Sequence, residues 1–246
     1  MFLKLQPFLN SLIFIFGLEF ILISPSSFSL IVLLLFLTAA FAGRKIGGRW
    51  FFAVLPIFFT LSSTALLYLI TIGFEQQIFI VLATLMYYMA LLSAYRLGDY
   101  AGDQTAKGMN MAVMISTIFF TYAGAYGLYL NFLVPLYYLM IVYLLVTLFV
   151  SYQYFLIIAQ NNRKTAWIYS FLLALVMTEI IWTMNFWPFG YLTTGVIALI
   201  LYYVLWDLMQ SYFLNLLSKK RVVANMTFFS VLIVLVLLSA KWIPVI

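Results

Sequence analysis

Long apolar runs alternate with short polar connections along the whole chain, and nine such runs can be marked. The runs are continuous, and most approach the roughly 20 residues that an α-helix needs to cross a bilayer. Barrel strands would instead alternate apolar and polar positions over about ten residues. The pattern predicts nine transmembrane helices, over Leu5–Ile23, Phe28–Ala42, Trp50–Ile72, Ile78–Tyr95, Met109–Leu130, Leu133–Ala159, Thr165–Phe186, Phe189–Tyr212 and Val222–Trp242.

Composition supports a membrane protein. The chain has 246 residues, of which 67% are hydrophobic and 7% charged, whereas a soluble domain carries about 25% charged residues. Because unpaired backbone groups are costly in lipid, spanning segments must be helices or closed barrels. We therefore predict an all-α, polytopic transmembrane helix bundle forming a single integral membrane domain over residues 1–246, with the lipid bilayer as its main partner.

The basic residues define an orientation. Apart from Lys241, every Lys and Arg lies before the first run or after an even-numbered run, so nine spans place them on one face. Positively charged loops stay in the cytoplasm, which predicts a cytoplasmic N-terminus and an external C-terminus. The abundance of Phe, Ile and Tyr suits an AT-rich bacterial genome, and we expect the bacterial cytoplasmic membrane.

Two residue types that serve many active sites do not occur. The sequence contains no Cys and no His, which excludes disulfides, thiolate metal sites, Ser–His and Cys–His catalysis and His- or Cys-bound haem. No nucleic-acid motif accompanies the net charge of +6. We expect no catalytic residue, metal, cofactor or nucleic-acid partner, and assign no enzymatic activity.

Proline and small residues predict local packing. Pro56, inside the third run, should kink that helix, and Ser62–Thr64 follow it as either a packing notch or part of a site. Small residues one helical turn apart let helices approach closely, and we expect the following pairs to join spans within the monomer: Ala39 with Gly43, and Ala123 with Gly127.

Three carboxylic acids in or near spans are candidate functional groups, since charge is costly within a bilayer. Glu19 and Glu179 fall in the outer halves of their runs, where only Lys241 is basic. These two acids are therefore expected to be protonated or to share hydrogen bonds. Asp207 lies near the inner end of its run and is interpreted as an interfacial charge, within reach of Lys219, Arg221 or water.

Aromatic residues in the outer half suggest a ligand site around these acids. Carboxylates with aromatic faces suit a cation or a sugar headgroup. The candidate ligand-binding residues are Glu179, Trp182, Glu19, Tyr122, Tyr126 and Tyr191. The alternative is an interfacial belt of Tyr and Trp, which most membrane proteins have, with Glu179 as structural glue between helices.

The longest inner connection contains Asp99 and Asp103, which would share a face on a helix. Paired aspartates can hold Mg²⁺ against a diphosphate. The favoured interpretation is a solvated connector in which Arg96 and Lys107 balance the two acids.

Three classes of function follow. The first is a small carrier or flippase for a small or lipidic solute, using the outer aromatic site. The second is a structural or assembly subunit that packs against another membrane protein. The third, less favoured, is an intramembrane enzyme that acts on a lipid-linked substrate through Asp99 and Asp103.

Overall fold

The computed structural model describes residues 2–132, 134–159 and 162–240, apart from the side chains of residues 2–4, 159 and 221. Leu133, Lys241 and Trp242, which the sequence placed in or beside spans, lie outside this part of the chain. The helices are α1 (Phe2–Ile23), η1 (Pro25–Ser27), α2 (Phe28–Gly47), η2 (Trp50–Ala53), α3 (Val54–Leu69), α4 (Gly73–Asp99), α5 (Gln104–Phe132), α6 (Leu136–Ala159), α7 (Arg163–Met184), α8 (Tyr191–Phe213) and α9 (Lys219–Ser239).

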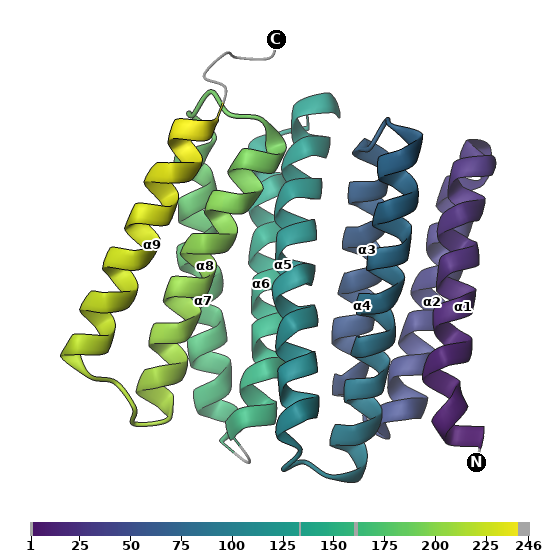
Figure 1. Cartoon of the computed structure of the whole chain (residues 1–246), viewed down its shortest axis with the longest axis horizontal. Helices are drawn as coiled ribbons and strands as arrows, with labels where there is room; N and C mark the ends of the chain where they lie inside the picture. Colours follow the sequence, from purple (N-terminus) through teal and green to yellow (C-terminus); the bar gives the residue numbers. More distant parts are fainter. Residues whose placement is uncertain (1, 133, 160–161, 241–246) are drawn as a thin grey trace. The chain divides into compact units, whose positions relative to one another are not determined.

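Nine segments of the described chain are long and apolar enough to cross a membrane. The predicted all-α bundle is confirmed, and the chain is a multi-pass membrane protein. It forms two compact units, Met1–Thr121 and Tyr122–Ile246, whose boundary lies inside α5. Within each unit, consecutive helices run side by side in alternating directions (Figure 1). The expectation of a single membrane domain stays a prediction.

Three aromatic rings form the centre of the first unit. Phe14 of α1 stacks on Tyr87 of α4, with 4.3 Å between ring centroids, and Phe59 of α3 lies 6.4 Å from Tyr87. All three side chains are buried. Such aromatic contacts add to the packing energy of the surfaces they bury, so this cluster joins α1, α3 and α4.

Glycines allow helix ends to meet in the same unit. A Cβ on Gly43 would lie 2.6 Å from the Ala53 Cα, and one on Gly98 would lie 3.0 Å from the Gly47 carbonyl oxygen. The ends of α2 and α4 therefore touch. Arg44, Lys45 and Arg49 thus lie at the same end of the unit as Arg96, in agreement with the predicted charge asymmetry.

The expected kink at Pro56 is wrong. The 3-10 helix η2 precedes α3, which begins at Val54, so Pro56 falls in the first turn of α3. A missing N–H costs nothing there, because the first-turn N–H groups have no partner within the helix. The hydroxyls of Ser62, Ser63 and Thr64 each donate to a carbonyl of the preceding turn of their own helix, which favours the packing interpretation.

The second unit is joined by a small-residue contact and a tyrosine pair. A Cβ on Gly195 of α8 would lie 2.9 Å from the Ala123 Cα of α5, so Ala123 packs spans within the monomer, as predicted. Tyr122 and Tyr143 stack with 4.1 Å between centroids. Figure 1 shows α9, in yellow, along α8 at the edge of the unit, and none of the described side chains of α9 is buried.

Candidate functional site

Tyr122 and Tyr126 lie inside the second unit. Their side chains are 0% and 1% exposed. The Tyr122 hydroxyl lies 2.6 Å from the Thr147 hydroxyl, and the Tyr143 hydroxyl donates to the Tyr122 carbonyl at 3.0 Å. These bonds link α5 to α6, and interhelical bonds of this kind contribute about 0.6–2 kcal/mol each in membranes. The two tyrosines therefore belong to the interior of the unit and not to an interfacial belt.

Glu179 and Trp182 share an exposed face of α7. Trp182 is 49% exposed and contacts Phe186 edge to face at 5.8 Å. Tyr191 is the first residue of α8 and is half-buried. The structure does not bring Glu179 and Trp182 together with the enclosed Tyr122 and Tyr126. A ligand role for any of these residues stays a prediction.

Glu19 belongs to the first unit, in α1. It is half-buried, and its carboxyl oxygen Oε2 accepts a hydrogen bond from the Gln77 Nε2 of α4 at 3.2 Å. A hydrogen bond shared with a neighbouring helix is one of the two arrangements that the sequence predicted for this acid. The pairing gives Glu19 a role in joining α1 to α4.

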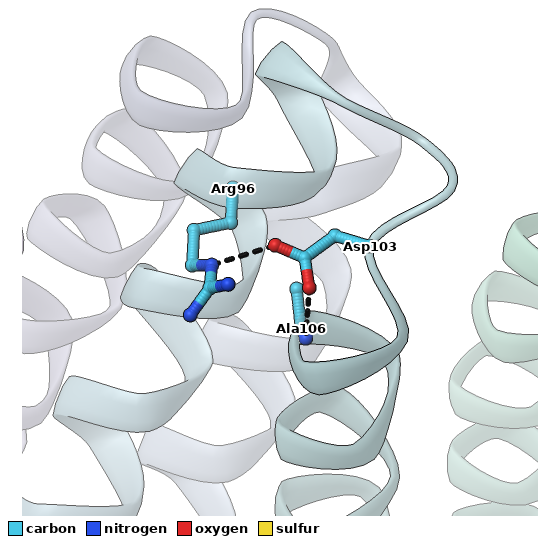
Figure 2. Close-up of polar contacts among 3 residues, drawn as sticks. All are labelled: Arg96, Asp103 and Ala106. Carbon is cyan, nitrogen blue, oxygen red and sulfur yellow. Dashed lines mark hydrogen bonds and ion pairs between the residues drawn. The ribbon is translucent and has the colours of Figure 1, made fainter.

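Asp99 and Asp103 occupy different elements. Asp99 ends α4 and is exposed, whereas Asp103 precedes α5. Figure 2 shows Asp103 between two donors: the Ala106 N–H at 3.1 Å and the Arg96 Nε at 2.7 Å. The first bond is a helix N-cap.

The same contacts favour the charged form of Asp103. The Ala106 N–H bond and the Arg96 guanidinium lower the pKa of the Asp103 carboxyl below its ordinary value. Both oxygens of its carboxylate are bonded within the connector between α4 and α5, which agrees with the interpretation of this segment as a connector whose acids are balanced by basic residues. Within the described residues, no three Asp, Glu, His or Cys side chains are placed to hold a metal ion.

Asp207 is more enclosed than an interfacial charge would be. Its side chain is buried, and its Oδ2 accepts a hydrogen bond from Asn225 Nδ2 of α9 at 2.5 Å. The sequence interpretation named Lys219, Arg221 or water as partners, which stays a prediction, and did not include Asn225. This bond, together with the contact of Tyr203 with Phe229 at 5.2 Å, holds α9 against α8.

A group of polar side chains near the ends of α6 and α8 was not predicted. Tyr154 of α6 packs on Trp206 of α8, with 5.1 Å between ring centroids, and hydrogen-bonds with the Gln210 side chain. Gln153 and Ser211 adjoin Tyr154 and Gln210 in sequence, and both are 2% exposed. We call Gln153, Tyr154, Trp206, Gln210 and Ser211 the α6–α8 polar cluster.

The cluster has unused hydrogen-bonding capacity. Four of its buried atoms find no hydrogen-bond partner among the described residues: Gln153 Oε1, Trp206 Nε1, Gln210 Oε1 and Ser211 Oγ. A buried polar atom without a partner costs about 1–3 kcal/mol, and in lipid no bulk water offsets that cost. Buried polar groups without a partner call for an explanation, and binding of a polar molecule is one.

A sequence signal for this cluster exists but is weak. Gln153 and Gln210 each lie a few residues before a basic connection, where polar residues are ordinary because the interface is near. Only the packing of α6 on α8, seen in the contact of Phe155 with Phe213 at 6.4 Å, brings the two stretches to one level. That pairing of helices cannot be read from apolar runs alone.

Comparison with known proteins gives one match. Residues 28–239 match the model of a family described as a protein of unknown function, DUF5656. The chain belongs to this DUF5656 family. No curated protein and no solved structure matches the chain. The DUF5656 match begins at the first residue of α2, so it leaves out α1 with Glu19, and it includes the whole α6–α8 polar cluster.

Proposed function

We propose that the protein is a carrier or flippase for a small or lipidic polar solute, and that the solute binds at the α6–α8 polar cluster. The observation that supports this is the group of four buried polar atoms without partners near the ends of α6 and α8. A solute that supplies donors and acceptors would satisfy them when bound. This places the site near the basic ends of the helices, away from the outer aromatic residues that the sequence favoured.

The residues of the cluster differ in the kind of hydrogen bond that they can make with a solute. The amide oxygens of Gln153 and Gln210 accept hydrogen bonds, the Trp206 indole N–H donates one, and the Ser211 hydroxyl can do both. The rings of Tyr154 and Trp206 provide an apolar wall beside these groups. Moderate binding of this kind suits a carrier, because a solute held by neutral hydrogen bonds can also leave.

A transport assay tests the proposal. We expect proteoliposomes to take up glycerol, sorbitol or glucose faster than protein-free liposomes in stopped-flow light scattering, or to flip a fluorescent glucosyl lipid in a dithionite-quenching assay. Replacing Gln153 and Gln210 together by Leu removes two acceptors, and should lower the accelerated rate by about tenfold or more, the value of roughly one to two hydrogen bonds.

The control is Gln104→Leu, which makes the same change at an exposed position at the start of α5 and should leave the rate unchanged. The proposal is wrong if the wild-type protein accelerates none of these probes. It is also wrong if the double variant, recovered as a folded protein, transports as fast as the wild type.

The alternative function, a structural or assembly subunit, is favoured by one observation. Glu179 has no hydrogen-bond or ion-pair partner among the described residues and lies on an exposed, aromatic-rich face of α7. An acid facing lipid is stabilised by a donor on another membrane protein. A helix with a Lys or Arg at the same depth would be such a partner, and chemical crosslinking from this face would then capture it.

A further inference from the structure

Within the proposed function, we infer that the solute is an amphiphile with an uncharged, hydroxyl-rich headgroup, such as a glycosyl lipid, which binds the α6–α8 polar cluster from the lipid beside α9. The inference rests on the proposed function for its transport role. It adds the class of substrate and the side from which the headgroup reaches the site.

The chemistry of the cluster selects hydroxyl groups. Its four unpartnered atoms comprise two amide acceptors, one indole donor and one hydroxyl. A hydroxyl both donates and accepts, so several neighbouring hydroxyls can satisfy this mixed set. The rings of Tyr154 and Trp206, which are tilted by 57° to one another, suit the C–H face of a sugar ring, because aromatic rings pack well against such apolar surfaces.

Charge at the site disfavours an anionic headgroup. Asp207 follows Trp206 directly on α8 and is one turn from Ser211. Its carboxyl accepts a hydrogen bond from Asn225, and the five members of the cluster include no basic side chain that would pair with a phosphate. The exposed Lys219 and Lys220 at the start of α9 make an anionic phospholipid the main competitor.

The depth of the cluster suits a lipid. Gln153 and Gln210 precede the ends of α6 and α8 at Ala159 and Phe213, by about 9 Å and 5 Å respectively at the helical rise of ~1.5 Å per residue. This is the level at which headgroups meet acyl chains in a bilayer. A headgroup bound there would leave its tail at the level of the hydrocarbon.

The neighbouring helix gives access from the lipid. None of the described side chains of α9 is buried, and α9 packs on α8 through contacts that include Asn225 with Asp207 and Phe229 with Tyr203. The ring centroid of Tyr203 in turn lies 5.6 Å from that of Trp206. The cluster is therefore one residue layer from a peripheral helix, and a lipid tail can remain in the bilayer while its headgroup occupies the site.

The test is a binding measurement, independent of transport. A glucosyl diacylglycerol with a photoreactive acyl chain is crosslinked to the purified full-length protein in detergent, and the labelled peptides are mapped. We expect labelling within α8 and α9, competition by unlabelled glucosyl diacylglycerol, and no competition by methyl glucoside at the same concentration. Gln210→Leu and, separately, Gln153→Met should each weaken competition by about tenfold, and Gln104→Leu should not.

The inference fails if methyl glucoside competes as well as the glycolipid, because the solute would then be a small sugar. It also fails if phosphatidylglycerol competes better than the glycolipid, or if both cluster variants bind the probe like the wild type. These outcomes of the binding measurement can be told apart from a failure of the proposed transport function. Specific glycolipid labelling without any transport would overturn the carrier role alone, and transport of free glucose without lipid labelling would overturn the amphiphile alone.

Discussion

Gly195→Val is expected to prevent the second unit from folding. A Cβ at this position would lie 2.8 Å from the Ala123 Cβ, 2.9 Å from its Cα and 3.0 Å from its backbone nitrogen. A backbone cannot rotate away as a flexible side chain can, so α5 and α8 would have to separate. Overpacking typically costs about 1–3 kcal/mol, and loss of the adjoining helix contacts should bring the total to the upper end of that range or beyond.

The measurement is the yield of monodisperse protein after detergent extraction, with its thermal unfolding followed by circular dichroism. Gly108→Ala is the matched control, because a Cβ there meets nothing within 4 Å, and Ala is a better helix former than Gly. We expect the control to be at least as stable as the wild type. A Gly195→Val protein with wild-type yield and unfolding temperature would contradict the close approach of α5 and α8.

Gly43→Val should be comparably damaging in the first unit. Its new Cβ would lie 2.6 Å from the Ala53 Cα and 3.0 Å from the Phe52 carbonyl oxygen, so the turn from α2 through η2 would have to open. That turn also sets the end of α2 beside α4. We expect protein that is largely aggregated on size-exclusion chromatography.

Gly73→Ala serves as the control for this second substitution, because a Cβ at Gly73 also has nothing within 4 Å. It should elute and unfold like the wild type. If Gly43→Val behaves like its control, the turn does not need a glycine, and the packing of α2 against η2 is other than described. The two valine variants together test the units separately.

Most of the fold could be predicted from the sequence because lipid imposes a simple rule. Each spanning segment needs about 20 apolar residues in a helix, and the nine runs agree with the helices to within a few residues. The boundaries failed where local turns decide them. Phe74–Gln77 fall between the predicted spans Trp50–Ile72 and Ile78–Tyr95, but they belong to the first turns of α4, because the chain turns over Ile70–Ile72 and Gln76 Nε2 donates to the Ile70 carbonyl.

The candidate site was harder to predict. Helical spacing correctly placed Tyr122 with Tyr126 on one face, and Glu179 with Trp182 on another. Spacing does not say whether a face meets protein or lipid, so it left open whether the first pair lines a ligand site or belongs to an interfacial belt, and both tyrosines are buried. The α6–α8 polar cluster depends on which helices become neighbours, and residues such as Gln153 and Gln210 have no distinctive pattern of their own.

Whether the cluster lies on the cytoplasmic side, as we expect from the basic residues, depends on the orientation of the spans, which can be measured directly. The sequence has no cysteine, so single cysteines can be introduced by Ser26→Cys, Lys45→Cys, Phe186→Cys and Lys219→Cys and treated in intact bacterial cells with a membrane-impermeant maleimide. We expect labelling at positions 26 and 186 in intact cells, and at 45 and 219 only after permeabilisation. Labelling of positions 45 and 219 from opposite sides, or of both from outside, would contradict it.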